Sequence, residues 1–233
     1  MSEPAVRREP PTPPSMPPRL QVIVGSTRPG RLALPIAAWA AEAARKHGGF
    51  EVELVDLADY GLPLLDEPGH PRAGRYEHEH TRRWSAKIKE ADAFVFVTPE
   101  YNYGPSVSLL NAVDYLHNEW MYAPVGFVSY GGIAGGLRSV QVMKQIVTTV
   151  RMMPVPEGVA VPFVMQHIED GVFTPPPPVA GSVGPMLAEL ARWANVLRPL
   201  RTSPPPPPPP LPGPPAALPG SAPAPGPQTV SAS

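Results

Sequence analysis

The segment Gly25–Arg31 has the residue types of a phosphate-binding loop. It reads Gly-Ser-Thr-Arg-Pro-Gly-Arg and follows Val22–Val24, a β-branched run suited to a strand buried on both faces. An alanine-rich segment of helical character, 32–47, comes directly after it. Free backbone N–H groups and the helix dipole favour an anion at such a helix N-terminus. Hydroxyl donors and planar guanidinium cations suit a terminal phosphomonoester, and these side chains are Ser26, Thr27, Arg28 and Arg31.

Two common nucleotide motifs do not match this loop. A dinucleotide-binding loop follows the pattern G-x-G-x-x-G, and Thr27 stands where its second glycine is needed. A Walker loop requires Lys and then Ser or Thr after its last glycine, whereas Gly30 is followed by Arg31 and Leu32. The alternative that remains is a tight turn with solvated arginines.

Two further loops have residues suited to a flat heteroaromatic ligand. Pro99–Pro105 follows an apolar run and has two tyrosines flanking an asparagine, and Ser129–Gly136 has paired glycines. Aromatic and peptide planes can cover the face of a ring, and fixed N–H groups can meet its edge. For the loop Ser129–Gly136 the alternative is a flexible turn. The candidate contacts in the loop Pro99–Pro105 are Pro99, Glu100, Tyr101, Asn102, Tyr103 and Gly104. Those in the loop Ser129–Gly136 are Ser129, Tyr130, Gly131 and Gly132.

The elements that must position these loops alternate along the chain. Strands are predicted at 21–24, 51–55, 93–98, 125–129 and 159–163, and helices at 32–47, 78–90, 106–117, 137–151 and 184–197. This alternation predicts an α/β fold, a doubly wound parallel sheet of five strands. Ligands of such sheets bind outside the carboxyl ends of the strands, where the three loops are expected to meet. A long loop at about 57–76 is interpreted as a lid or an interface element.

Composition limits the classes of protein that the chain can represent. It has 38 prolines in 233 residues, concentrated at both ends, so we predict disordered proline-rich tails at 1–18 and 199–233 around one domain at 19–198. The net charge of −1 does not indicate nucleic-acid binding. No cysteine is present, which excludes disulfides, thiolate nucleophiles and iron–sulfur clusters. No signal peptide or apolar run long enough for a membrane span is visible, and a soluble cytoplasmic protein is expected.

The three loops together resemble the NAD(P)H-dependent FMN reductase family, with its quinone, chromate and azo-dye reductase relatives. The resemblance rests on GSTRPGR, PEYNYG and SYGG at successive loops and covers about residues 20–198. Asn111-Ala-Val-Asp-Tyr115 is similar to the family's helix after PEYN, although Tyr115 replaces a tryptophan. The phosphate loop also departs from the family, since Gly30 and Leu32 stand where many members have serine and asparagine.

This resemblance implies a flavodoxin-like fold with strand order 2-1-3-4-5 and helices on both faces. It implies FMN as cofactor, with the phosphate held by Ser26, Thr27, Arg28 and Arg31. Residues 99–103 would line the isoalloxazine ring, and 129–132 would meet its pyrimidine side. Electrons would pass from NADPH or NADH through FMN to a small acceptor such as a quinone or free flavin, without a catalytic side chain. Members of the family are commonly homodimers or homotetramers.

The sequence leaves two other functions open. A flavodoxin-type electron carrier would need an acidic docking surface, which a net charge of −1 does not favour. An interaction protein could recruit partners through proline-rich tails.

Glu100 is expected to brace its loop or to bond across a subunit interface. No metal site is expected, because His78 and His80 are two apart in a predicted helix and face different directions. Asp56 could mimic a ribose-binding acid, but the glycine fingerprint for that function is missing.

Overall fold

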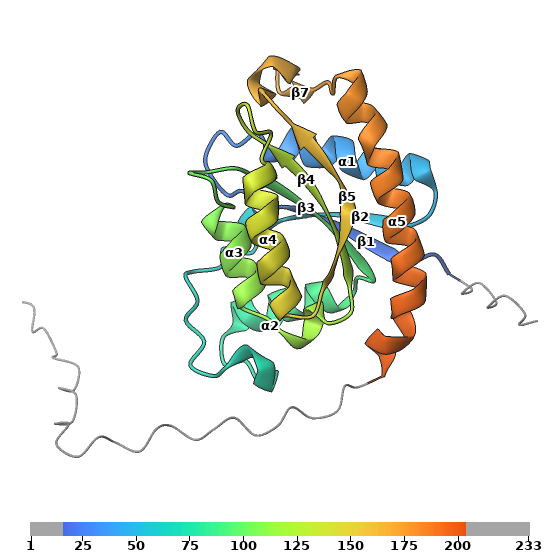
Figure 1. Cartoon of the computed structure of the whole chain (residues 1–233). Coiled ribbons are helices and arrows are strands. Elements are labelled where there is room, and N and C mark those ends of the chain that lie inside the picture. Colours follow the sequence, from blue (N-terminus) through green and yellow to red (C-terminus); the bar gives the residue numbers. More distant parts are fainter. Residues whose placement is uncertain (1–15, 204–233) are drawn as a thin grey trace, which may run out of the picture. The chain divides into compact units, whose positions relative to one another are not determined.

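The computed structural model describes residues 16–203 and is built on a parallel sheet of five strands (Figure 1). The strand order is β2-β1-β3-β4-β5, as the flavodoxin-like resemblance implied. The strands are β1 (Arg19–Val24), β2 (Glu51–Asp56), β3 (Ala93–Pro99), β4 (Pro124–Tyr130) and β5 (Met153–Val161). Every residue of β3 and β4 is buried, as expected for central strands covered on both faces.

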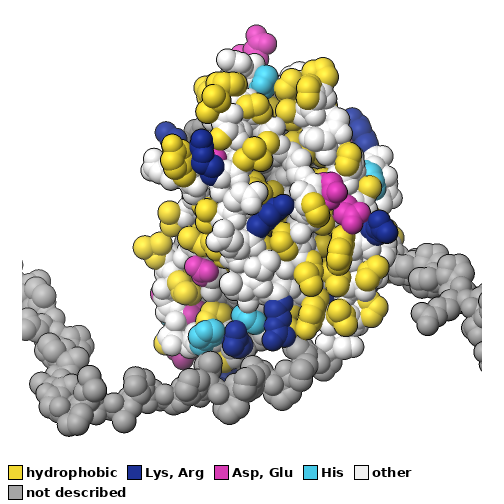
Figure 2. All heavy atoms as spheres, in the orientation of Figure 1, with side chains coloured by type: hydrophobic (Ala, Val, Ile, Leu, Met, Phe, Trp, Pro, Cys, Tyr) yellow, Lys and Arg dark blue, Asp and Glu magenta, His cyan; other side chains and the backbone are white. Residues whose placement is uncertain are grey.

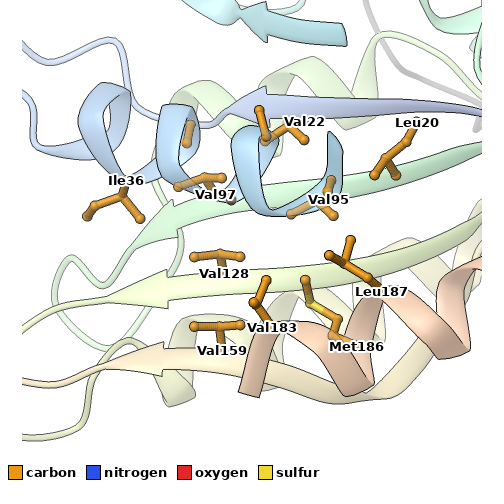
Figure 3. Close-up of a cluster of buried hydrophobic side chains, with 14 of the residues drawn as sticks. Leu20, Val22, Ile36, Val95, Val97, Val128, Val159, Val183, Met186 and Leu187 are labelled. Atoms are coloured by element: carbon orange, nitrogen blue, oxygen red, sulfur yellow. The ribbon is translucent and has the colours of Figure 1, made fainter. Parts of the chain in front are cut away.

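Helices cover both faces of the sheet. They are α1 (Ala33–His47), α2 (Glu79–Lys89), α3 (Val107–Asp114), α4 (Leu137–Thr149) and α5 (Pro177–Thr202). Alternate side chains of β3 divide between two cores, because successive residues of a strand point to opposite faces. Val95 and Val97 pack with α1 and α5, in the cluster drawn in Figure 3. Phe94 and Phe96 pack with the residues of α2, α3 and α4. The predicted fold class is confirmed.

The fifth strand begins earlier than the predicted 159–163. The strand contains Pro154, Pro156 and Gly158, which are residues that normally count against a strand. They are tolerated because β5 lies at the edge of the sheet, where the backbone N–H that proline lacks is not needed to pair with a further strand. The pairing of β4 with β5 is also irregular between Val125 and Phe127.

The last helix is longer than the predicted 184–197 and passes the predicted domain end at residue 198. Gly181, Gly184 and Pro185 obscure its first turns in the sequence, but Val179 and Val183 are buried against the sheet. At the other end, the Arg201 guanidinium donates to the carbonyls of Ala91 and Met121, at 2.8 and 2.7 Å. The predicted tails otherwise lie outside the described residues.

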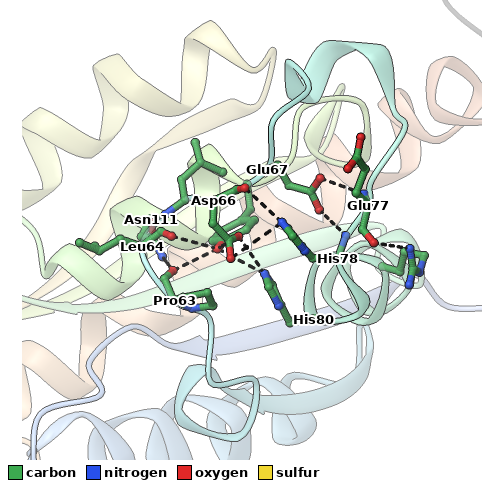
Figure 4. A network of polar contacts seen from close by, with 11 residues as sticks. Pro63, Leu64, Asp66, Glu67, Glu77, His78, His80 and Asn111 are labelled. Carbon is green, nitrogen blue, oxygen red and sulfur yellow. Dashed lines mark hydrogen bonds and ion pairs between the residues drawn. The ribbon is translucent and has the colours of Figure 1, made fainter. Parts of the chain in front are cut away.

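The long loop after β2 is held against α2 and α3. It contains two short 3-10 helices, η1 (Leu57–Asp59) and η2 (Pro71–Ala73). Asn111 of α3 donates its amide to the carbonyl of Pro63 at 2.6 Å and accepts from the N–H of Leu65 at 2.9 Å. The Tyr115 hydroxyl donates to the Asp66 carboxylate at 2.9 Å (Figure 4). The segment 63–67 is therefore fixed to the helix that follows β3.

His78 and His80 complete this contact from the start of α2. Their rings stack, with centroids 5.2 Å apart, because His78 precedes the first helical residue. The expectation that they face different directions is therefore wrong. Both approach Asp66, and the His80 Nε2 lies 3.0 Å from its carboxylate (Figure 4). Desolvation raises the pKa of the Asp66 carboxyl, but hydrogen bonds from Tyr115 and His80 lower it. The net result is a pKa below the usual value. Among residues 16–203 no three His, Asp or Glu side chains are grouped so that they could hold a metal ion.

Candidate functional site

The loops that follow β1, β3 and β4 meet at one edge of the sheet. They line a cavity of about 170 Å³ together with the start of η4 (Val164–His167). Its lining residues are Arg28, Gly30, Arg31, Leu32, Pro99, Glu100, Tyr101, Tyr130, Gly131 and Val164. Sequence reasoning placed the three loops together, and the structure brings them together. Val164 was not predicted.

The first loop leaves β1 through Gly25, where a side chain could not fit. The Gly25 N–H donates to the carbonyl of Val97 at 2.9 Å, and a Cβ atom would lie 2.6 Å from that same oxygen. The Gly25 carbonyl accepts from the hydroxyls of Ser106 and Ser108, the latter at 2.8 Å. Both serines lie at the start of α3, so the loop 25–31 is anchored to the helix that follows the loop after β3. Their role was not visible in the sequence.

The predicted phosphate ligands differ in how accessible they are. Ser26 is 1% exposed, and its hydroxyl lies 3.1 Å from the Tyr101 hydroxyl. Its side chain therefore links the loop 25–31 to the loop after β3. Thr27 is exposed and lines a neighbouring cavity of about 240 Å³, between this loop, η1 and α3. Arg28 is exposed and forms no ion pair within residues 16–203.

Arg31 is paired with Asp56, the acid that lacks the glycine fingerprint needed for a ribose-binding role. Its guanidinium bonds to the Asp56 carboxylate at the end of β2, and both side chains are largely buried. Asp56 also accepts from the N–H of Ala58 at 3.0 Å, so it caps η1. Its carboxylate is thus engaged within the protein and is not free for a ribose. Part of the Arg31 charge is neutralised by this pair, and its Nε has no partner among the described residues.

Backbone donors supplement these side chains. No hydrogen bond among the described residues uses the N–H of Ser26 or Thr27, and no side chain caps the N-terminus of α1. Free N–H groups at a helix start attract an anion. With Arg28 beside them, the loop has the donors and the positive charge that a phosphate needs.

The second loop forms a tight two-residue turn. Tyr101 and Gly104 exchange two backbone hydrogen bonds of 2.9 Å each. Between them, Asn102 and Tyr103 both have positive φ angles, 50° and 68°. Their N–H groups donate to no acceptor among the described residues, so they are available to a ligand. The predicted wall of the site therefore has backbone donors at its rim.

Glu100 is not placed as a catalytic acid. Its carboxylate pairs with the guanidinium of Arg138 and accepts the backbone N–H of Arg138 at 3.1 Å. The Glu100 N–H donates to the carbonyl of Tyr130 at 3.1 Å. Glu100 thus braces its loop against the start of α4 within one chain. Arg138 was not singled out from the sequence, because nothing local marks it as a partner of a residue 38 positions away.

The third loop is more closed than expected. Ser129 is fully buried, and its hydroxyl donates to the carbonyl of Gly135 at 2.8 Å. The Ser129 side chain therefore does not line the cavity. The Gly131 N–H donates to the carbonyl of Val161 at 3.2 Å. The Gly132 N–H has no acceptor among the described residues.

Tyr130 has a buried hydroxyl that has no hydrogen-bond partner among the described residues, and the residue lines the same cavity as Arg28 and Arg31 of the loop 25–31. The residue is 5% exposed and lines the cavity, and its oxygen has no hydrogen bond among the described residues. Burial raises the pKa of this hydroxyl above its usual value, while Arg31 and Arg28 lower it by smaller amounts. The hydroxyl therefore stays protonated and can donate to an anionic or carbonyl oxygen. Together with the free N–H groups and Arg28, it gives the cavity an unused set of donors.

Residues 18–166 match the model of a protein family described as NADPH-dependent FMN reductase, which covers more than half of the chain. The chain belongs to this family. The expected reductase class, with FMN and NAD(P)H as cofactors, is confirmed at the level of the family.

Relatives and solved structures agree with this membership. An NAD(P)H-dependent FMN reductase of Schizosaccharomyces pombe is 42% identical over 160 residues, covering 68% of this chain and 80% of the relative. Another, from a Nectria species, is 34% identical over 165 residues, covering 66% and 82%. The structure of a flavoenzyme NAD(P)H:(acceptor) oxidoreductase from Paracoccus denitrificans has a TM-score of 0.61 and 20% identity, over 77% of this chain and 98% of that one. That structure supports the fold of this family member.

Proposed function

We propose that this family member binds FMN at the three loops, with the phosphate on the loop 25–31. The observation that carries the proposal is a set of unused donors on and beside one cavity. Arg28 and Tyr130 line the cavity, and the N–H groups of Ser26 and Thr27 lie in the adjoining loop 25–31. These groups suit a phosphate dianion, because charge-assisted bonds to several donors are stronger than neutral ones. Arg31, balanced by Asp56, adds a weaker positive field at the same place.

The ring of the cofactor would lie against the turn formed by residues 101–104. Bound FMN supplies the redox chemistry, and the protein supplies position and electrostatics. The free N–H groups of Asn102 and Tyr103 are suited to hydrogen-bond acceptors at a ring edge. The N–H of Gly132 would favour negative charge on a carbonyl oxygen of the ring system. No side-chain nucleophile or acid–base pair is needed for this arrangement.

The reaction proposed is the transfer of electrons from NADPH or NADH to a small acceptor. Relatives of this chain include a probable NADPH:quinone oxidoreductase of rice, 36% identical over 101 residues, and an NADPH azoreductase of a Bacillus strain, 32% identical over 124 residues. We infer that this chain also reduces planar acceptors such as quinones, which can alternate with nicotinamide in one open site.

A single experiment tests the proposed function. The purified full chain is incubated with FMN, freed of excess cofactor and mixed with NADPH, or separately NADH, in the absence of oxygen. The expected result is a yellow protein whose visible absorbance is lost on reduction and returns when a quinone is added. A protein that stays colourless after incubation with FMN would contradict the proposal.

We also propose that the chain assembles with a second copy through the rim of the cavity. Exposed apolar side chains lie on neighbouring loops there, because the N–H of Phe163 donates to the carbonyl of Gly132 at 3.0 Å. Figure 2 shows hydrophobic side chains gathered at the upper end of this face, near β7 (Val172–Phe173). The exposed apolar residues of the rim are Ile133, Leu137, Phe163 and Met165. Light scattering should give a multiple of the 24.9 kDa chain mass, and Met165→Glu should lower it.

A further inference from the structure

Arg138 contacts the turn of the second loop from the start of α4 in three ways. Its guanidinium pairs with the Glu100 carboxylate, and its backbone N–H donates to the other carboxylate oxygen at 3.1 Å. Its guanidinium carbon also lies 4.2 Å from the ring centroid of Tyr103, which is a cation–π contact. One side chain therefore holds both ends of the segment from Glu100 to Tyr103.

The turn that Arg138 holds has an unfavourable backbone conformation. Asn102 and Tyr103 both adopt positive φ, a region where tyrosine in particular is uncommon. The Tyr103 side chain is 68% exposed, so core packing does not keep it in place. Turns of this kind normally rely on glycine at the second central position, where this chain has tyrosine. The conformation therefore depends on restraints from neighbouring elements.

Glu100 is the rigid part of this restraint. Its side chain is 9% exposed, and its own N–H is bonded to the carbonyl of Tyr130 in the adjacent strand. A carboxylate in such a position needs a compensating partner, and Arg138 is the cation paired with it among the described residues. Arg138 keeps 45% of its side chain exposed, so its removal creates no cavity in either core.

We propose that Arg138 is a positioning residue for the cofactor. It holds the turn 101–104 in the conformation that leaves the N–H groups of Asn102 and Tyr103 available, before any ligand is present. Loss of this restraint makes the ordering of the turn a cost of binding, and affinity falls accordingly. This inference rests on the proposed function, since it concerns how the site presents donors to FMN.

The test measures FMN affinity by quenching of flavin fluorescence in titrations of apo-protein. Arg138→Gln removes the charge and the cation–π contact and is expected to raise the FMN dissociation constant about tenfold. Arg138→Lys retains the charge opposite Glu100 and is expected to restore most of the affinity. Tyr103→Leu removes the cation–π contact, together with any contact between the Tyr103 ring and the flavin, and is expected to weaken binding about two- to fivefold.

A matched control separates positioning from general stability. Arg192→Gln removes another exposed helical arginine with an acidic partner, Glu189, and is expected to leave FMN affinity unchanged. The thermal midpoint of each apo-variant is recorded in parallel. Unchanged FMN affinity in Arg138→Gln would overturn the inference, as would equal losses in the Lys and Gln variants. Should Arg138→Gln fail to fold, Tyr103→Leu decides, and unchanged affinity there also overturns it. Absence of FMN binding by the unsubstituted chain is a different outcome, which contradicts the proposed function itself.

Discussion

Substitution of Arg28 by glutamine should weaken FMN binding through the phosphate alone. Arg28 is exposed and has no acidic partner among residues 16–203, whereas the charge of Arg31 is shared with Asp56. A hydrogen bond to a charged group contributes about 1.5–3 kcal/mol. The FMN dissociation constant of Arg28→Gln is therefore expected to rise about 10- to 150-fold.

The assay compares two ligands on the same protein. Apo-protein is titrated with FMN and with riboflavin, which has the same ring system and no phosphate. The affinity of Arg28→Gln for riboflavin should equal that of the unsubstituted chain, because the lost interaction is with the phosphate. Added salt should weaken FMN binding more in the unsubstituted chain than in the variant, since salt screens an exposed charge.

Arg31→Gln provides the comparison for this prediction. It should affect FMN less than Arg28→Gln, because part of the Arg31 charge is already neutralised. It should also lower the free energy of unfolding, because the largely buried Asp56 carboxylate loses its partner. Equal losses of FMN and riboflavin affinity in Arg28→Gln would refute the reasoning. A larger FMN effect in Arg31→Gln would also refute it.

Three further predictions concern the stability of the folded chain. Gly25→Ala should lower the free energy of unfolding in urea by about 1–3 kcal/mol, because its Cβ would lie 2.6 Å from the Val97 carbonyl; an unchanged value would show that the loop can shift freely. Burial lowers the pKa of His117, so stability should fall as pH drops below about 6.5, and His117→Asn should reduce that slope in urea titrations; an unaltered slope would contradict this. Asp66→Asn should destabilise the chain at pH 7, with a difference from the unsubstituted chain that narrows below about pH 4, because the pKa of Asp66 is lowered in the folded state; a difference independent of pH would count against it.

The order of elements could be predicted from the sequence because the apolar runs are short, unbroken and separated by helical patterns. Val22–Val24 and Ala93–Val97 each form a buried parallel strand, and the loops that follow them meet as expected. The parts that differ are those where tertiary packing overrides local preference. The first half of β5 contains two prolines, and α5 has Gly184 and Pro185 in its early turns. Burial against the sheet, which a window of sequence does not report, decides both cases.

The candidate loops of the site were predictable, but the pairing of their side chains was not. Residue types identified the three loops, since glycine, hydroxyl and guanidinium groups have a clear use beside a phosphate. Arg31 and Asp56 are 25 positions apart, and Glu100 and Arg138 are 38 apart. Nothing local in the sequence specifies such pairs. For the same reason, the hydrogen bonds of the Ser26 and Ser129 hydroxyls inside the protein could not be predicted from the sequence.

The central claim is that three loops hold FMN with its phosphate on the loop 25–31. A crystal structure of the full chain grown with FMN tests this most directly. We expect the phosphate within hydrogen-bonding distance of Arg28 and of the N–H groups of Ser26 and Thr27, with the ring against residues 99–104. A flavin bound elsewhere, or a phosphate directed away from Arg28 into solvent, would contradict it.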